Sequence, residues 1–184
     1  MKKISLRHQL ENYISLSAEE MESRDKMLNL LQIETRCFHR DCFPAHFTGS
    51  ALIIDPQTQM VLLNHHRTLN KWLQFGGHCD GNENILEVAH REALEESGIH
   101  SLTSFSHNPI DLDIHAIPAN PKRSEPAHFH YDVRFIFLSS KSNKFLLSEE
   151  SHELRWFSWD EISQLSIDKN FRRYLNKARS FKLN

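Results

Sequence analysis

Glycine is scarce in this chain, and the few glycines are not spread evenly. The 184 residues include five of them, and four lie between residues 76 and 98. Glycine is needed where a backbone turns sharply or where another group approaches it closely. The clustering therefore marks the segment 76–98 as the first place to look for a functional site.

Cysteine is scarce too, and long hydrophobic runs are missing. Three cysteines are an odd number, which argues against a disulfide framework and suits a reducing compartment. The segment CFHRDC, residues 37–42, lacks the spacing of common zinc sites, so Cys37 and Cys42 are interpreted as reduced, partly buried thiols. No stretch approaches the roughly 18 apolar residues of a membrane span, and no apolar segment follows the two N-terminal lysines. These absences predict a soluble, cytoplasmic protein.

No sign of charge dominates the chain. The formal net charge is -2 and the isoelectric point is about 6.7, which gives no global attraction to nucleic acid or to anionic membranes. We therefore expect neither as a partner. A ligand that carries phosphate must instead be held by a local group of residues.

The order of sequence patterns predicts the fold class. Residues 4–34 are expected to be helical, with SAEE at 17–20 as a capping start. Short strand-like runs follow, interrupted by one central helix, and two helices end the chain, the first of them capped by Ser158. This order favours an α/β fold of the α+β type, with a mixed sheet between helices. The strand-like runs are residues 51–54, 60–63, 111–117 and 128–138.

The same pattern suggests a division of the chain. Residues 1–44 are expected to form an N-terminal helical extension that packs on the domain, and residues 45–184 to form the domain itself. The extension has two alternative roles. It could form the contact of a homodimer, or it could act as a lid over the substrate pocket.

The central helix, NILEVAHREALEES, carries an unusual arrangement of acids. At about 100° per residue, six residues fall within roughly one third of its circumference, so that the stripe begins apolar and ends acidic. Carboxylates crowded at the edge of a core repel one another and are costly to desolvate, and a bound divalent cation removes that cost. Hard oxygen ligands suit Mg²⁺ or Mn²⁺, to which a carbonyl of the glycine loop can add a ligand. The six residues are Ile85, Val88, Ala89, Glu92, Glu95 and Glu96.

The segment GHCDGNENILEVAHREALEESGI, residues 77–99, resembles the signature of the Nudix hydrolase superfamily. That signature has a glycine, a glutamate six residues later, then Arg-Glu, Glu-Glu and a glycine at fixed spacings, followed by an aliphatic residue. Each fixed position is filled here, and the probability that seven such positions match by chance is negligible. The filled positions are Gly77, Glu83, Arg91, Glu92, Glu95, Glu96, Gly98 and Ile99.

The resemblance implies the Nudix fold and Mg²⁺-dependent (or Mn²⁺-dependent) hydrolysis of a nucleoside diphosphate linked to another group. It assigns the metal ligands to the Gly76 carbonyl, Glu95 and Glu96, with Glu92 as a further metal ligand or as the base for the water. It implies that Arg91 orients the acidic cluster by hydrogen bonding and that Glu83 connects the loop to the helix. The catalytic residues would be Glu92, Glu95 and Arg91, although the base can also lie on a later loop, where Glu149, Glu150 and Glu153 are candidates.

Two other functions remain open from the sequence. An enzyme similar to isopentenyl-diphosphate isomerase shares the scaffold, but where that enzyme has Cys-Gly-His this chain has Gly76-Gly77-His78, and Cys79 is the nearest thiol. A sensor that binds a nucleotide without turnover is the second alternative. The leaving group of the hydrolase stays undetermined.

A small-molecule, nucleotide-type substrate is expected to contact the strand HFHYDVRFIFL, residues 128–138. Alternate residues share a face, which places His128, His130, Asp132 and Arg134 together. The apolar residues that follow on that face suggest an opening in a buried layer. Arg134 suits a phosphate because its planar fork can bind two oxygens. His78, beside the glycine loop, is the fifth candidate for substrate binding.

Overall fold

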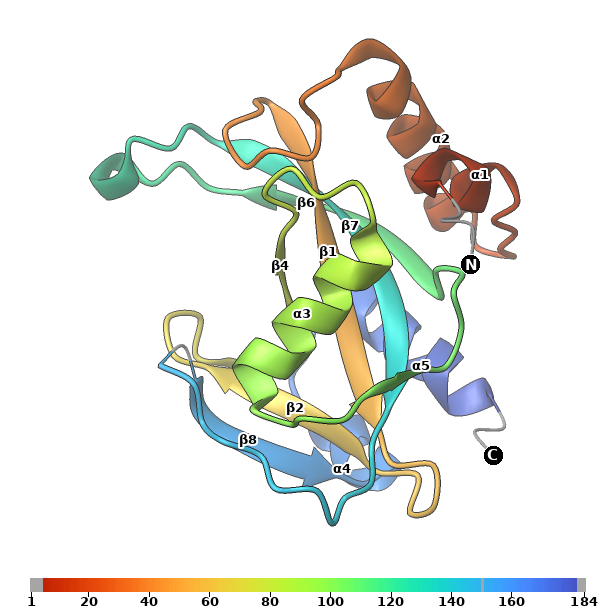
Figure 1. The fold of residues 1–184 in the computed structure, drawn as a ribbon, viewed down its shortest axis with the longest axis vertical. Coiled ribbons are helices and arrows are strands. Elements are labelled where there is room, and N and C mark those ends of the chain that lie inside the picture. The colour runs from red at the N-terminus through yellow and green to blue at the C-terminus, as the bar shows by residue number, and fades with distance from the viewer. Residues whose placement is uncertain (1–4, 150, 182–184) are drawn as a thin grey trace.

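The computed structural model describes residues 5–149 and 151–181. Helices come first, then strands interrupted by one central helix, and then two more helices, as predicted. The described residues form one eight-stranded mixed sheet with helices on both faces (Figure 1). This arrangement confirms the predicted fold class. The strands are β1 (Ala45–Ile54), β2 (Val61–His66), β3 (Lys71–Leu73), β4 (Phe75–His78), β5 (Thr103–Ser104), β6 (Asp111–Ile117), β7 (His128–Leu138) and β8 (Ser151–Phe157).

The helices begin and end where the local sequence provides caps. The Ser17 hydroxyl accepts from the Glu20 N–H, and Ser158 forms a reciprocal capping box with Glu161. Gly98 ends the central helix in the left-handed conformation, with φ of 65°. The helices are α1 (Leu6–Glu11), α2 (Ala18–Ile33), α3 (Ile85–Ser97), α4 (Trp159–Gln164) and α5 (Lys169–Ser180), with a 3₁₀ turn at Pro121–Arg123.

Two long strands in the middle of the sheet organise the fold. Strands β1 and β7 pair in parallel over ten residues, from Ala45 opposite Phe129 to Ile54 opposite Leu138. On its other edge β1 pairs first with β4 and then, beyond Ala51, with β2. The edge of β1 is therefore a fork at which β2 and β4 separate.

Each face of the sheet has its own hydrophobic core. One core joins the sheet to α1, α2 and α3, with Phe47 and Phe135 among its members, and the other joins it to α4 and α5, with Leu52 and Ile136. Adjacent residues of β1 and β7 thus enter opposite cores, as expected for strands covered on both faces. Figure 1 shows α3 crossing one face, with α4 and α5 behind the sheet.

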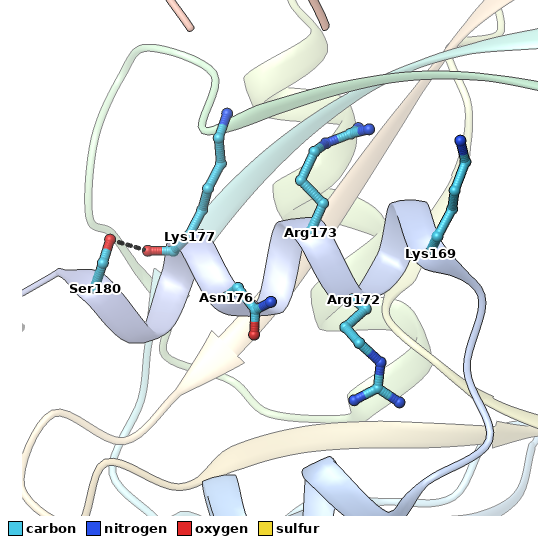
Figure 2. Close-up of a pocket in the computed structure, with 6 residues that line it drawn as sticks. All are labelled: Lys169, Arg172, Arg173, Asn176, Lys177 and Ser180. Carbon is cyan, nitrogen blue, oxygen red and sulfur yellow. Dashed lines mark hydrogen bonds between the residues drawn. The ribbon is translucent and has the colours of Figure 1, made fainter. Parts of the chain in front are cut away.

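Ion pairs join the N-terminal helices to α5. Figure 2 shows Lys169, Arg173 and Lys177 on one side of α5, beside a surface hollow that they help to line. Lys169 Nζ lies 2.7 Å from Glu19 of α2, and Lys177 contacts the buried carboxylate of Glu20. Lys169, Arg173 and Lys177 thus pair with acids of the chain itself. Through these contacts the helices within residues 5–34 pack against the rest of the described chain. The predicted domain boundary at residue 44 stays a prediction.

Candidate active site

Strand β4 carries the paired glycines, and both are required by close neighbours. Gly76 has a φ of 155°, and a Cβ there would overlap the Ser50 hydroxyl of β1. A Cβ on Gly77 would lie 2.6 Å from the Glu92 carboxylate. Gly77 thus lies where Glu92 of α3 comes close to the backbone of β4, whereas Gly76 is required by its positive φ and by its closeness to β1.

Glu96 bridges the fork between β2 and β4. It is 9% exposed, and its carboxylate accepts from the Gly76 N–H and from Asn64 Nδ2, each at 3.3 Å. Asn64 belongs to β2, so the carboxylate contacts both strands just where they diverge from β1. Asn64 could not be predicted from the sequence, because a lone asparagine 32 residues from its partner carries no local signal.

Arg91 ties the acidic cluster to the glycine strand. Its Nη1 lies 2.8 Å from Glu92 Oε1 and 3.4 Å from Glu95 Oε2, and its Nη2 donates to the His78 carbonyl at 3.0 Å. These contacts bring together the residues that the motif placed in one site.

The three glutamates differ in exposure. The side chain of Glu92 is 14% exposed and that of Glu95 is 61% exposed, so Glu95 lies outside the buried stripe that the helical pattern suggested. Ala93 takes a place in the core instead. Burial raises the pKa of Glu92, with Arg91 opposing that rise and Glu95 adding to it.

A divalent cation suits this donor set. The carboxylates are hard oxygen ligands, and Glu92 is held over a glycine whose missing side chain leaves its carboxylate room. A cation would also relieve the mutual repulsion of Glu92 and Glu95. The residues present therefore fit the Mg²⁺ or Mn²⁺ that the motif implies.

The alternative bases have different positions. Glu153 lies opposite His65 in the β2–β8 pair, and because neighbouring residues point to opposite faces, it projects away from the face that carries Asn64 and Glu96. Glu149 is exposed in the segment before β8, and Glu150 lies outside the described residues. Glu83 is exposed as well, and it is Asn82 that accepts from the Asn84 N–H at the start of α3.

Asp132 and Arg134 are enclosed by other parts of the chain. Arg134 is 3% exposed, and the alternation of β7 suggested instead that it borders an opening. Its guanidinium pairs with three carboxylates at 2.8 to 3.2 Å, which raise its pKa although burial opposes the charge. Leu52 and Ile136 continue this face into a core covered by α5, which closes over the arginine. The carboxylates are those of Asp111, Asp113 and Asp132.

The predicted histidines gather with one that the sequence analysis missed. His78, His128 and His130 surround His46 of β1, with ring centroids 4.9 to 5.2 Å from that of His46. Burial lowers the pKa of His78 to about 4 and, together with the neighbouring imidazoles, that of His130 to about 2. His78 and His130 are therefore neutral at pH 7.

The three thiols lie in the interior. Cys37, Cys42 and Cys79 are buried and free, as the odd number of cysteines suggested. Burial raises the pKa of Cys37 to about 11 and that of Cys79 well above its usual range. Cys79 is thus an unreactive thiol at neutral pH.

The fold and the acidic helix place this protein in a known class. The sequence model of the family described as NUDIX domain matches residues 45–178, and the chain therefore belongs to the Nudix family of pyrophosphohydrolases. Among the described residues no helix is long and apolar enough to cross a membrane.

Three similar proteins illustrate the relationship. The m7GpppN-mRNA hydrolase NUDT17 of Homo sapiens is 33% identical over 102 residues, which are 52% of this chain and 31% of that protein. A NUDIX-family hydrolase from Clostridium perfringens has 24% identity and a TM-score of 0.54, covering 73% of this chain and 96% of its own. A Caenorhabditis elegans Ap4A hydrolase has 16% identity and a TM-score of 0.57, with the same coverage. The two structures show the fold, and the chain spans about a third of the length of the human protein.

Proposed function

We propose that this protein hydrolyses the diphosphate bond of a nucleoside diphosphate linked to another group, with Mg²⁺ or Mn²⁺ held by the Gly76 carbonyl, Glu92, Glu95 and Glu96. The observation that carries the proposal is the position of the Glu92 and Glu96 carboxylates directly against the backbone of Gly76 and Gly77. The cation would screen the negative charge of the diphosphate and lower the pKa of a bound water.

The protein groups have separate tasks in this proposal. Glu92 accepts the proton of the water that attacks phosphorus, because its carboxylate is held over Gly77 and burial raises its pKa, which makes it a better base. Arg91 fixes Glu92 and Glu95 relative to the His78 carbonyl, and Asn64 and the Gly76 N–H fix Glu96. For Asp132 and Arg134 we propose a structural role in place of substrate binding.

The isomerase alternative is less well supported. It needs a reactive thiol at the glycine strand, and the residue at the corresponding position is Gly76. The nearest thiol, Cys79, is 2% exposed, and its raised pKa keeps it protonated. The sensor alternative differs from the hydrolase only in turnover, so an assay of turnover separates the two.

The first expected result concerns the metal. Phosphate or nucleotide release should appear with Mg²⁺ or Mn²⁺ on at least one member of a panel that contains ADP-ribose, a dinucleoside polyphosphate, a cap dinucleotide and nucleoside triphosphates. Release should stop with a chelator and return when the cation is restored. A rate that is independent of metal would contradict the scheme, and nucleotide binding without any turnover would favour the sensor.

The second expected result concerns the base. Glu92→Gln should lower kcat by about 10²- to 10³-fold, because the amide cannot accept the proton of the water. Glu153→Gln, on the opposite face of the sheet, should retain kcat within about twofold, and Glu149→Gln serves as a second comparison. If Glu92→Gln remains active while one of these two loses turnover, the base lies in the later segment.

A further inference from the structure

Histidines from three strands meet on the face of the sheet opposite α3. His46 of β1 lies directly opposite His130 of β7, and Thr48, two residues after His46 on the same face, lies opposite His78 of β4. Directly opposed residues project from the same face, so the three rings converge. Their centroids are 4.9 to 5.2 Å apart.

The spacing of the ring nitrogens suits a shared cation. One nitrogen of each ring lies within 4.8 Å of the other two. In a tetrahedral zinc site with Zn–N bonds of about 2.1 Å, such nitrogens are about 3.4 Å apart, so ring movements of about 1 Å close the site. His128 adjoins the group, with its Nε2 3.3 Å from that of His130.

The protonation of His46 is set by its backbone partner. Its Nδ1 lies 3.1 Å from the Cys42 carbonyl, which can only accept, so Nδ1 carries the proton and Nε2 keeps a lone pair. His46 is 1% exposed, and its Nε2 has no hydrogen-bond partner among the described residues. A buried acceptor without a partner is unfavourable, and a carbonyl on the far nitrogen is the usual support of a metal-binding histidine.

The donors also distinguish this cluster from the acidic site. Gly77 faces Glu92 on the α3 side of β4, whereas the side chain of His78 emerges on the other side. Three imidazole nitrogen donors favour a borderline transition cation, while carboxylates favour Mg²⁺. The two groups of ligands thus select different ions across a single strand.

We propose that His46, His78 and His130 form a second metal site that binds a zinc-type divalent cation, with water in the fourth position. The site is distinct from the carboxylate site of α3, and the proposal does not depend on the hydrolase activity. It adds to the fold a nitrogen-donor centre that joins β1, β4 and β7 at one end of the sheet.

The test uses the full chain without a polyhistidine tag. After treatment with chelator, the protein is equilibrated with one equivalent of Zn²⁺ or Co²⁺ in millimolar Mg²⁺, which occupies oxygen sites, and is then dialysed. We expect about one Zn²⁺ per chain by elemental analysis, and visible absorption of the Co²⁺ form typical of a four-coordinate site. Retention of no Zn²⁺ by the wild-type chain would overturn the proposal.

Three variants locate the site. His46→Asn keeps a donor for the Cys42 carbonyl and removes Nε2, and His78→Asn tests the less buried ligand in case the first variant fails to fold. Each should weaken Zn²⁺ binding at least about 100-fold and abolish the Co²⁺ absorption. His152→Asn, on the exposed surface of β8, should bind as the wild type does. Equal Zn²⁺ retention by folded His78→Asn and wild type would refute the assignment.

Discussion

Glu96→Gln is expected to lower kcat by about 10³-fold or more, which corresponds to about 4 kcal/mol of lost transition-state stabilisation. The substitution removes the negative charge from the carboxylate that is fixed by Asn64 and the Gly76 N–H. The amide keeps the shape of the side chain, and its oxygen can still accept one of these hydrogen bonds. The loss should therefore appear in steady-state kinetics at saturating Mg²⁺, with at most about 1 kcal/mol of change in the free energy of unfolding.

Glu87→Gln is the matched control. Glu87 lies on the exposed side of the same helix, outside the acidic site, so its replacement changes the net charge equally. Its kcat should stay within about twofold of the wild-type value, as is typical of surface substitutions away from a site. Near-normal turnover of Glu96→Gln at saturating Mg²⁺ would show that the assignment of Glu96 as a metal ligand is wrong.

Arg134→Ala is expected to lower the free energy of unfolding by about 3–5 kcal/mol, because it leaves buried carboxylates without their cation. Arg134 contacts Asp111, Asp113 and Asp132. Asp111 also pairs with Arg173, whereas Arg134 is the one cation that pairs with Asp132 among the described residues. Burial opposes the charge of Asp113, yet His115 and Arg134 hold its pKa near 2, so it is ionised at pH 7. Urea denaturation at pH 7 measures the loss.

Two further variants separate this structural role from phosphate binding. Arg134→Lys keeps the charge but not the fork, so it should recover only part of the lost stability. Lys169→Ala removes an exposed cation from the nearby α5 and should cost at most about 1 kcal/mol. If Arg134→Ala unfolds like the wild type while its KM rises tenfold or more, the original prediction of a phosphate ligand is correct and the structural role is not.

Much of the acidic helix could be predicted from the sequence. Its cap at Gly98, its buried Ile85 and Ala89, and the neighbourhood of Arg91 to Glu92 and Glu95 depend on residues within one or two helical turns. Such contacts follow from a period of 3.6 residues, whatever the rest of the chain does. The strand 128–138 was predicted with its observed bounds for a similar reason, because alternation is also a local pattern.

Only the tertiary structure decided the partners of the polar residues. No local pattern near Arg134 predicts its contact with Asp111, and none near His46 predicts its contact with His78. Strand pairing brings together residues that are far apart along the chain. The fork of β1 likewise places Asn64 and Gly76 on either side of Glu96. The sequence by itself determined the order of the helices and of four strands, and which helix carries the acids, whereas the short strands β3, β4 and β5 and the strand β8 were not predicted. The pairing of the strands determined which charges are buried together, because a polar group can be enclosed only where another part of the chain supplies its partner.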